Sequence, residues 1–84
     1  MSKFDSNTLG NNLFKTNGSL KFHLMDILNK KHITRYALAK ATNIRYDTIC
    51  NYCSGNVTLI NVEYIKIFCE ILDCKIEDIL TYEK

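Results

Sequence analysis

The chain has 84 residues, of which 46% are hydrophobic, and a formal net charge of +2. This length fits one small domain, and the hydrophobic fraction is too high for a disordered chain. No apolar run approaches the roughly 20 residues that cross a bilayer, and the first twenty residues lack the apolar stretch of a signal peptide. We therefore expect a cytoplasmic, nucleoid-associated protein with no membrane partner.

The charges are distributed unevenly along the chain. Residues 21–53 have six Lys or Arg against two Asp, a net charge of +4, whereas residues 54–84 have three Lys against six Asp or Glu, a net charge of −3. A basic half suggests that the first part of the domain binds a polyanion.

The beginning of the chain predicts an arm followed by a helix. Residues 1–19 are rich in Asn, Ser, Thr and Gly and are interpreted as an N-terminal arm, which leaves 20–84 as the domain. Ser19 is a candidate N-cap for a helix over about 20–31, in which apolar residues recur at helical spacing.

Two short helices are predicted in the middle of the chain. Thr34 precedes the helix formers of residues 35–41 and is expected to cap them. Asn43 accepts a positive φ more readily than other residues except Gly, so it can end that helix sharply. The next helix covers about 46–53, and Gly55 closes it.

Asn61 is expected to cap a fourth helix over about 62–72, and a fifth covers about 76–82. No alternating strand pattern follows the arm. The predicted fold is therefore an all-α, compact five-helix domain.

The segment between Thr34 and Gly55 predicts a helix-turn-helix. The link between its two helices is too short for them to lie antiparallel, so they must cross steeply. The crossing needs a small residue on the first helix, where the second helix passes. It also needs a turn residue that tolerates positive φ, and apolar residues that pack the second helix against the first. The residues at these places are Leu38, Ala39, Asn43, Ile44 and Ile49.

This segment resembles the Cro and lambda-repressor type of helix-turn-helix, also called the XRE type. The matching positions are Thr34, Leu38, Ala39, Thr42, Ile44, Thr48, Ile49, Tyr52 and Gly55. The chain departs from the family pattern at Asn43, where Gly is preferred, and at 45–47, where many members have small polar residues or Gln. Operator specificity therefore cannot be transferred from a relative. The resemblance covers about 21–82 and implies a five-helix DNA-binding domain.

The resemblance implies which side chains contact DNA. Base contacts are assigned to Tyr46, Asp47 and Asn51 on the helix that enters the major groove. Asn51 can pair with adenine and Asp47 can accept from cytosine, while Tyr46 can contact a thymine methyl group or a phosphate. The residues expected at the sugar-phosphate backbone are Thr34, Arg35, Lys40, Arg45 and Thr48.

The tyrosines at 36, 52 and 64 are expected to pack in the core rather than to bind a ligand. Four cysteines, Cys50-x2-Cys53 and Cys69-x4-Cys74, allow a zinc-binding module with four cysteine ligands as a rival hypothesis. We favour no metal, because these cysteines complete helical apolar stripes and a free cysteine packs as a small hydrophobe.

We predict no cofactor, no small-molecule substrate and no enzymatic activity, since the sequence has no phosphate-binding Gly-rich loop and no nucleophile motif.

The predicted function is that of a sequence-specific transcriptional regulator, a repressor that binds double-stranded DNA as a homodimer. The last helix, with Ile76, Ile79, Leu80 and Tyr82, or the N-terminal arm is expected to form the dimer surface. The alternative is a protein-interaction domain of the same fold, antitoxin-like or structural.

Overall fold

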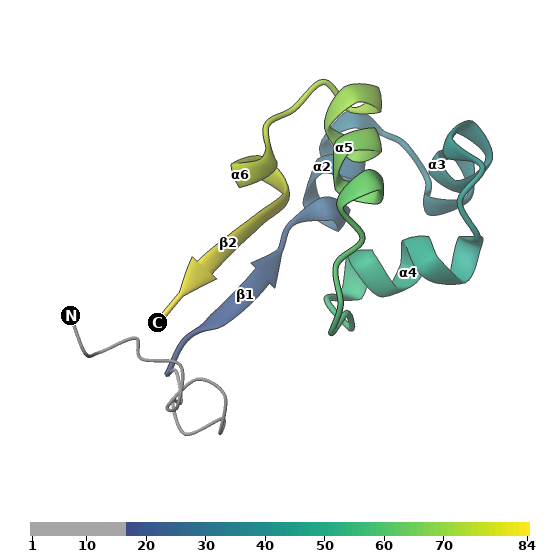
Figure 1. The fold of residues 1–84 in the computed structure, drawn as a ribbon. Coiled ribbons are helices and arrows are strands. Elements are labelled where there is room, and N and C mark those ends of the chain that lie inside the picture. Colours follow the sequence, from purple (N-terminus) through teal and green to yellow (C-terminus); the bar gives the residue numbers. More distant parts are fainter. Residues whose placement is uncertain (1–16) are drawn as a thin grey trace.

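The computed structural model describes residues 17–84, which form five helices and two strands. In chain order these elements are β1 (Ser19–Phe22), α2 (Leu24–Lys31), α3 (Arg35–Thr42), α4 (Tyr46–Ser54), α5 (Val62–Ile71), α6 (Ile76–Ile79) and β2 (Leu80–Glu83). The helices gather into one body, from which the two strands extend side by side as a ribbon (Figure 1). Most of the predicted arm, 1–16, lies outside the described residues.

The expected all-α class is wrong at the two ends of the domain. β1 and β2 form an antiparallel sheet in which Leu20 pairs with Tyr82 and Phe22 with Leu80. The first helix starts at Leu24 instead of about 20, and the last helix has only four residues. Each strand has only four residues, too few to show the alternation of apolar and polar residues that identifies a strand in a sequence. The two strands also lie about sixty positions apart in the chain, so their pairing is not visible locally.

The ribbon is joined to the helices by hydrogen bonds at its inner end. The backbone N–H of His23 donates to the carbonyl of Ile79 at 2.6 Å, and the His23 ring lies 2.9 Å from the Thr81 hydroxyl. His23, and not Ser19, precedes the first helix, and no side chain caps it. The strands therefore continue directly from the first and last helices.

The remaining helix ends follow the sequence signals closely. The Thr34 hydroxyl accepts a hydrogen bond from the N–H of Ala37 at 3.0 Å, and the Asn61 side chain accepts one from the N–H of Glu63 at 2.9 Å. Gly55 ends α4 in the left-handed conformation, with φ of 80°. No helix among residues 17–84 is long and apolar enough to span a membrane.

Tyr52 lies at the centre of an aromatic cluster in the core. Its ring makes edge-to-face contacts with Phe22, Tyr64 and Phe68, with centroids 5.6 to 6.1 Å apart. Tyr36, which was expected in the core, is 63% exposed. The buried core residues are Leu24, Leu28, Leu38, Ala39, Ile44, Ile49, Tyr52, Ile65, Phe68, Leu72 and Ile79.

Replacing Phe68 with Ala should lower the free energy of unfolding by about 3–5 kcal/mol, because the fully buried ring leaves a cavity among several elements. The control is Ile71→Ala on the same helix, where the side chain is 43% exposed and the loss should stay below about 1 kcal/mol. Urea unfolding followed by circular dichroism measures both. Equal losses for the two variants would contradict this account of the core.

Candidate nucleic-acid interface

The turn between α3 and α4 has the predicted helix-turn-helix geometry. Asn43 ends α3 with φ of 60°, in the left-handed region, and α4 begins three residues later. The Thr42 hydroxyl donates to the carbonyl of Leu38 at 2.8 Å and accepts from the N–H of Ile44 at 3.3 Å. These bonds fix the turn, so the direction of α4 relative to α3 is set locally.

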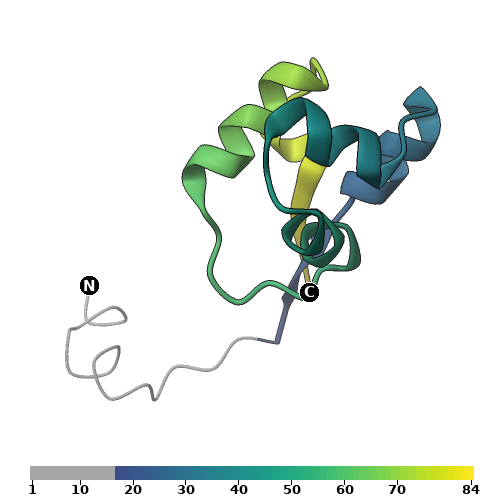
Figure 2. The same cartoon turned by 90° about the vertical axis from the view of Figure 1, so that its right-hand side faces the viewer.

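Apolar contacts hold the crossing. The four residues that the sequence places between the helices are all buried: Leu38, Ala39, Ile44 and Ile49. When α4 is viewed nearly along its axis, α3 lies across it rather than alongside (Figure 2). The predicted steep crossing is confirmed.

The three residues expected to contact bases lie exposed on α4. Asp47 and Asn51 are separated by about one turn and project on the side opposite the buried Ile49 and Tyr52. Tyr46, at the start of the helix, is 43% exposed and lies toward α3.

Ser54 also lies on this side of the helix, at its last position. It is exposed, and its hydroxyl donates to the carbonyl of Asn51 at 3.2 Å. Asp47, Asn51 and Ser54 are spaced four and then three residues apart, so they share one side of α4.

Two cations lie over tyrosine rings, one between α3 and α4 and one within α3. The Arg35 guanidinium carbon lies 5.9 Å from the centroid of the Tyr46 ring, and the Lys40 ammonium lies 5.7 Å from that of Tyr36. The exposed Tyr36 ring thus has a neighbour, the Lys40 ammonium group, that the sequence pattern did not reveal.

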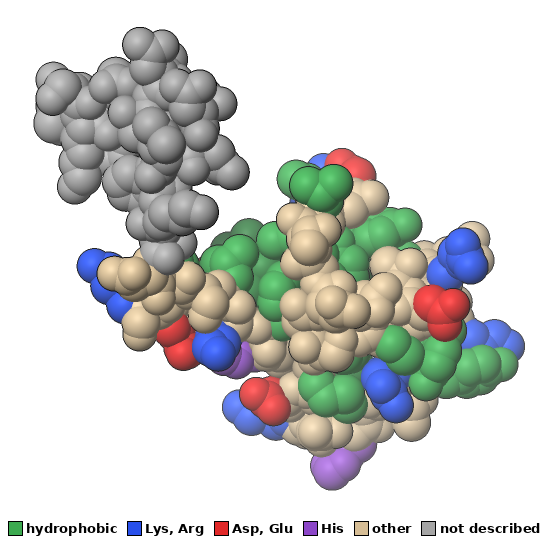
Figure 3. Space-filling model, turned by 90° about the horizontal axis from the view of Figure 1, so that it is seen from below, with side chains coloured by type: hydrophobic (Ala, Val, Ile, Leu, Met, Phe, Trp, Pro, Cys, Tyr) green, Lys and Arg blue, Asp and Glu red, His purple; other side chains and the backbone are tan. Residues whose placement is uncertain are grey.

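The other residues expected at the DNA backbone lie around the same two helices. Thr34 is exposed at the start of α3, and Arg45 is exposed in the turn. Thr48 is half-buried on the side of α4 that faces α5. Seen from the α4 side, the middle of the surface is uncharged, and Lys and Arg side chains lie around the margin together with Asp and Glu (Figure 3).

Two side chains on α4, Tyr46 and Cys53, have raised pKa values. A hydrogen bond with the Cys50 side chain raises the pKa of Tyr46 above its ordinary value, although the nearby Arg35 guanidinium acts in the opposite direction. The Tyr46 phenol therefore stays protonated at neutral pH and can donate a hydrogen bond. Burial raises the pKa of Cys53, which keeps its thiol neutral as well.

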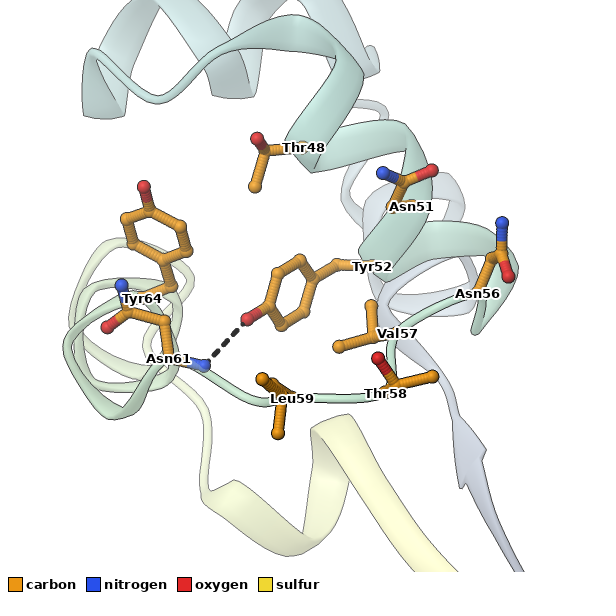
Figure 4. Close-up of a pocket in the computed structure, with 9 residues that line it drawn as sticks. All are labelled: Thr48, Asn51, Tyr52, Asn56, Val57, Thr58, Leu59, Asn61 and Tyr64. Atoms are coloured by element: carbon orange, nitrogen blue, oxygen red, sulfur yellow. Dashed lines mark hydrogen bonds between the residues drawn. The ribbon is translucent and has the colours of Figure 1, made fainter.

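A hollow of about 290 Å³ lies beside α4, between that helix, the α4–α5 loop and the start of α5 (Figure 4). At its floor the Tyr52 hydroxyl accepts a hydrogen bond from the backbone N–H of Asn61 at 2.9 Å. Its lining residues are Thr48, Asn51, Tyr52, Asn56, Val57, Thr58, Leu59, Asn61 and Tyr64. The hollow is neutral, because none of these side chains has a charge at neutral pH.

The cysteines do not assemble a metal site in the described part of the chain. Cys50 and Cys53 lie on α4, whereas Cys69 lies on α5 and Cys74 follows that helix. All four are free thiols, and among residues 17–84 no three His, Cys, Asp or Glu side chains are grouped so that they could hold a metal ion. Cys53, Cys69 and Cys74 instead pack against the hydrophobic core.

A family model described as a Cro/C1-type HTH DNA-binding domain matches residues 23–84. The chain belongs to this family. The matched region runs from the residue before α2 to the end of the chain and includes the whole helix-turn-helix, so DNA is the partner that this domain family implies. No curated protein and no solved structure gave a significant match to the chain.

The turn predicts a clear difference between two substitutions at Asn43. Asn43→Ala should lower the free energy of unfolding by about 1–2 kcal/mol, because the Ala side chain is disfavoured at positive φ. Asn43→Gly, the matched control, should remain within about 1 kcal/mol of the parent protein, since Gly adopts this conformation without steric cost. Thermal and urea unfolding test the pair. If Ala were tolerated as well as Gly, positive φ would not be a constraint at this turn.

Proposed function

We propose that this Cro/C1-type domain is a sequence-specific transcriptional regulator, and more specifically a repressor, that inserts α4 into the major groove of double-stranded DNA. The observation that supports this proposal is the exposed polar side of α4, which is held by a fixed turn and bordered by Arg35. A helix of this length fits the major groove, where each base pair presents a distinct pattern of donors and acceptors.

The base-contact assignment rests on side-chain chemistry. Asn51 offers both an amide donor and a carbonyl acceptor, so it can form two hydrogen bonds with adenine. Asp47 can accept a hydrogen bond from the amino group of cytosine. Tyr46, with a protonated hydroxyl and an exposed ring, can donate to a phosphate or contact a thymine methyl group.

The backbone-contact assignment rests on position and charge. Arg35 of α3 lies beside Tyr46 of α4, Lys40 is in the last turn of α3, and Arg45 precedes α4 directly. We expect their charges to neutralise phosphates on one side of the groove. Thr34 and Thr48 offer hydroxyl groups, which position the domain without reading sequence.

A domain this small would gain from binding DNA as a homodimer, with one copy on each half-site of a pseudo-palindrome. One recognition helix reads about one half-site, and a second copy adds both affinity and specificity. Repression follows most simply, because a bound dimer can block a promoter by occupying it.

A protein-interaction domain of the same fold is the alternative. The observation that favours it is the exposure of Tyr36, at 63%, and of Tyr46, at 43%, since aromatic side chains are enriched at protein interfaces. The cations beside both rings favour DNA over this alternative, because phosphates would neutralise them.

Binding to a random-sequence duplex library at two salt concentrations tests the proposal. An enriched palindromic motif, with affinity that falls steeply as salt rises, is the expected result. Absence of both enrichment and salt-dependent binding would remove the DNA hypothesis and leave the protein-interaction domain.

Two substitutions should separate base contacts from phosphate contacts. Asn51→Ala should reduce discrimination at one base pair by about 1–3 kcal/mol. Lys40→Ala should weaken binding to all sequences alike and reduce the slope of log affinity against log salt by about 1. Competition binding with single-base variants of the selected site measures the first effect. The same binding assay at several salt concentrations measures the second.

Lys66→Ala is the matched control for charge. Lys66 lies on α5, where it pairs with Glu63 at 3.3 Å, so its removal should change neither specificity nor the salt slope appreciably. If Asn51→Ala and Lys40→Ala behaved alike, the division into base and phosphate contacts would be wrong.

A further inference from the structure

Two of the four cysteines lie on α4, where the proposed DNA contacts do not use them. Cys50 and Cys53 are three residues apart, so they are neighbours on one side of the helix. Both are half-buried free thiols. Cys53, like Cys69 and Cys74, packs against the core, which leaves Cys50 as the one cysteine of residues 17–84 that does not.

A tyrosine and an arginine complete the surroundings of this thiol pair. Tyr46 lies one helical turn before Cys50 and shares a hydrogen bond with its side chain, and the Arg35 guanidinium carbon lies 5.9 Å from the centroid of the Tyr46 ring. Burial raises the pKa of the Cys53 thiol, the Arg35 guanidinium opposes this rise, and Cys50 adds to it. A partly exposed thiol near a cation, with a second thiol one turn away, is the arrangement that oxidants convert to a disulfide.

A bond between these two sulfur atoms would change the turn of α4 that matters most for the proposed function. The loop that it closes contains Asn51, which is assigned to a base contact, and Tyr52, whose ring packs in the aromatic cluster of the core (Figure 4). Both residues would therefore be affected by one covalent bond.

The geometry of a regular helix requires that this turn opens when the bond forms. Neighbouring Cβ atoms on one side of a helix are about 5–6 Å apart, whereas a disulfide needs Cβ atoms about 3.5–4.5 Å apart. α4 ends at Ser54, one residue after Cys53, so the change can be confined to its last turn.

We propose that Cys50 and Cys53 are a peroxide-responsive thiol pair, whose disulfide opens the last turn of α4 and thereby weakens DNA binding. The bond displaces Asn51 from its place on the exposed side of the helix. It also removes the Cys50 thiol with which the Tyr46 hydroxyl shares a hydrogen bond. The effect on DNA rests on the proposed function, whereas the formation of the disulfide does not.

The oxidant is a hydroperoxide, which accepts the two electrons that the thiols lose. The Cys50 sulfur attacks its outer oxygen, so that an S–O bond forms as the O–O bond breaks, and the Cys50 proton leaves with the released alcohol or water. The Cys53 sulfur then attacks the Cys50 sulfur. The S–S bond forms, the S–O bond breaks, and water leaves with the Cys53 proton.

Peptide mapping of the full chain after treatment with hydrogen peroxide tests the disulfide without DNA. Trypsin cleaves after Arg45, Lys66 and Lys75, so the peptide 46–66 contains only the α4 pair and the peptide 67–75 contains only Cys69 and Cys74. After the treated protein is unfolded and labelled with N-ethylmaleimide, the peptide 46–66 should have lost two hydrogen atoms and carry no label. The peptide 67–75 should be fully labelled, and dithiothreitol should restore labelling of 46–66.

DNA binding is measured on the same samples with the duplex selected from the random library. Oxidation should lower the affinity by at least about tenfold, because the loss of one bidentate base contact has an effect of this size, and dithiothreitol should restore it. Cys50→Ser and Cys53→Ser should each bind DNA without responding to peroxide. Cys69→Ser combined with Cys74→Ser, the matched control, should respond like the parent protein. Circular dichroism confirms that each variant folds.

A peptide 46–66 that peroxide leaves unchanged would overturn the thiol pair, and so would a disulfide that involves the peptide 67–75. A Cys50–Cys53 disulfide that leaves both the helix content and the DNA affinity unchanged would overturn the opening of α4. A reduced protein that binds no DNA would instead refute the proposed function, while the disulfide and the loss of helix content in 46–66 would still be observed.

Discussion

Tyr52 makes the contacts on which the position of α4 depends. Its ring packs against Phe22 of β1 and against Tyr64 and Phe68 of α5, while its hydroxyl accepts a hydrogen bond from the N–H of Asn61. One side chain of α4 is thus in contact with the first strand, the following loop and the next helix. Because a buried aromatic side chain with a satisfied hydroxyl has little freedom to move, α4 is held in one orientation relative to the core.

The turn before α4 complements this packing. Asn43 changes the chain direction, and the Thr42 hydroxyl bonds to backbone groups on both sides of it. α4 is therefore fixed at its start by local hydrogen bonds and along its length by the core. Its polar side can remain exposed without a loss of order, which is what preorganised recognition of DNA requires.

The sequence predicted those features that arise from neighbouring residues. The caps at Thr34 and Asn61 and the breaks at Asn43 and Gly55 act within a few positions, so their chemistry was visible in the chain. The exposed positions of α4 were expected from the resemblance to the Cro and lambda-repressor type, and the three residues named there are exposed. The ribbon was not predictable in this way, since its short strands pair across most of the length of the domain. The exposure of Tyr36 was missed because residue type alone favours burial.

The sequence by itself determined the helix-turn-helix, its family and the side chains that α4 presents, because these depend on spacing within one short segment. Tertiary structure decided which apolar residues remain on the surface. Ile79 and Leu59 are both apolar residues that local patterning could place in the core or at a surface, yet one is fully buried and the other almost fully exposed. Only the packing of distant elements distinguishes them, because burial depends on which surfaces the fold brings together.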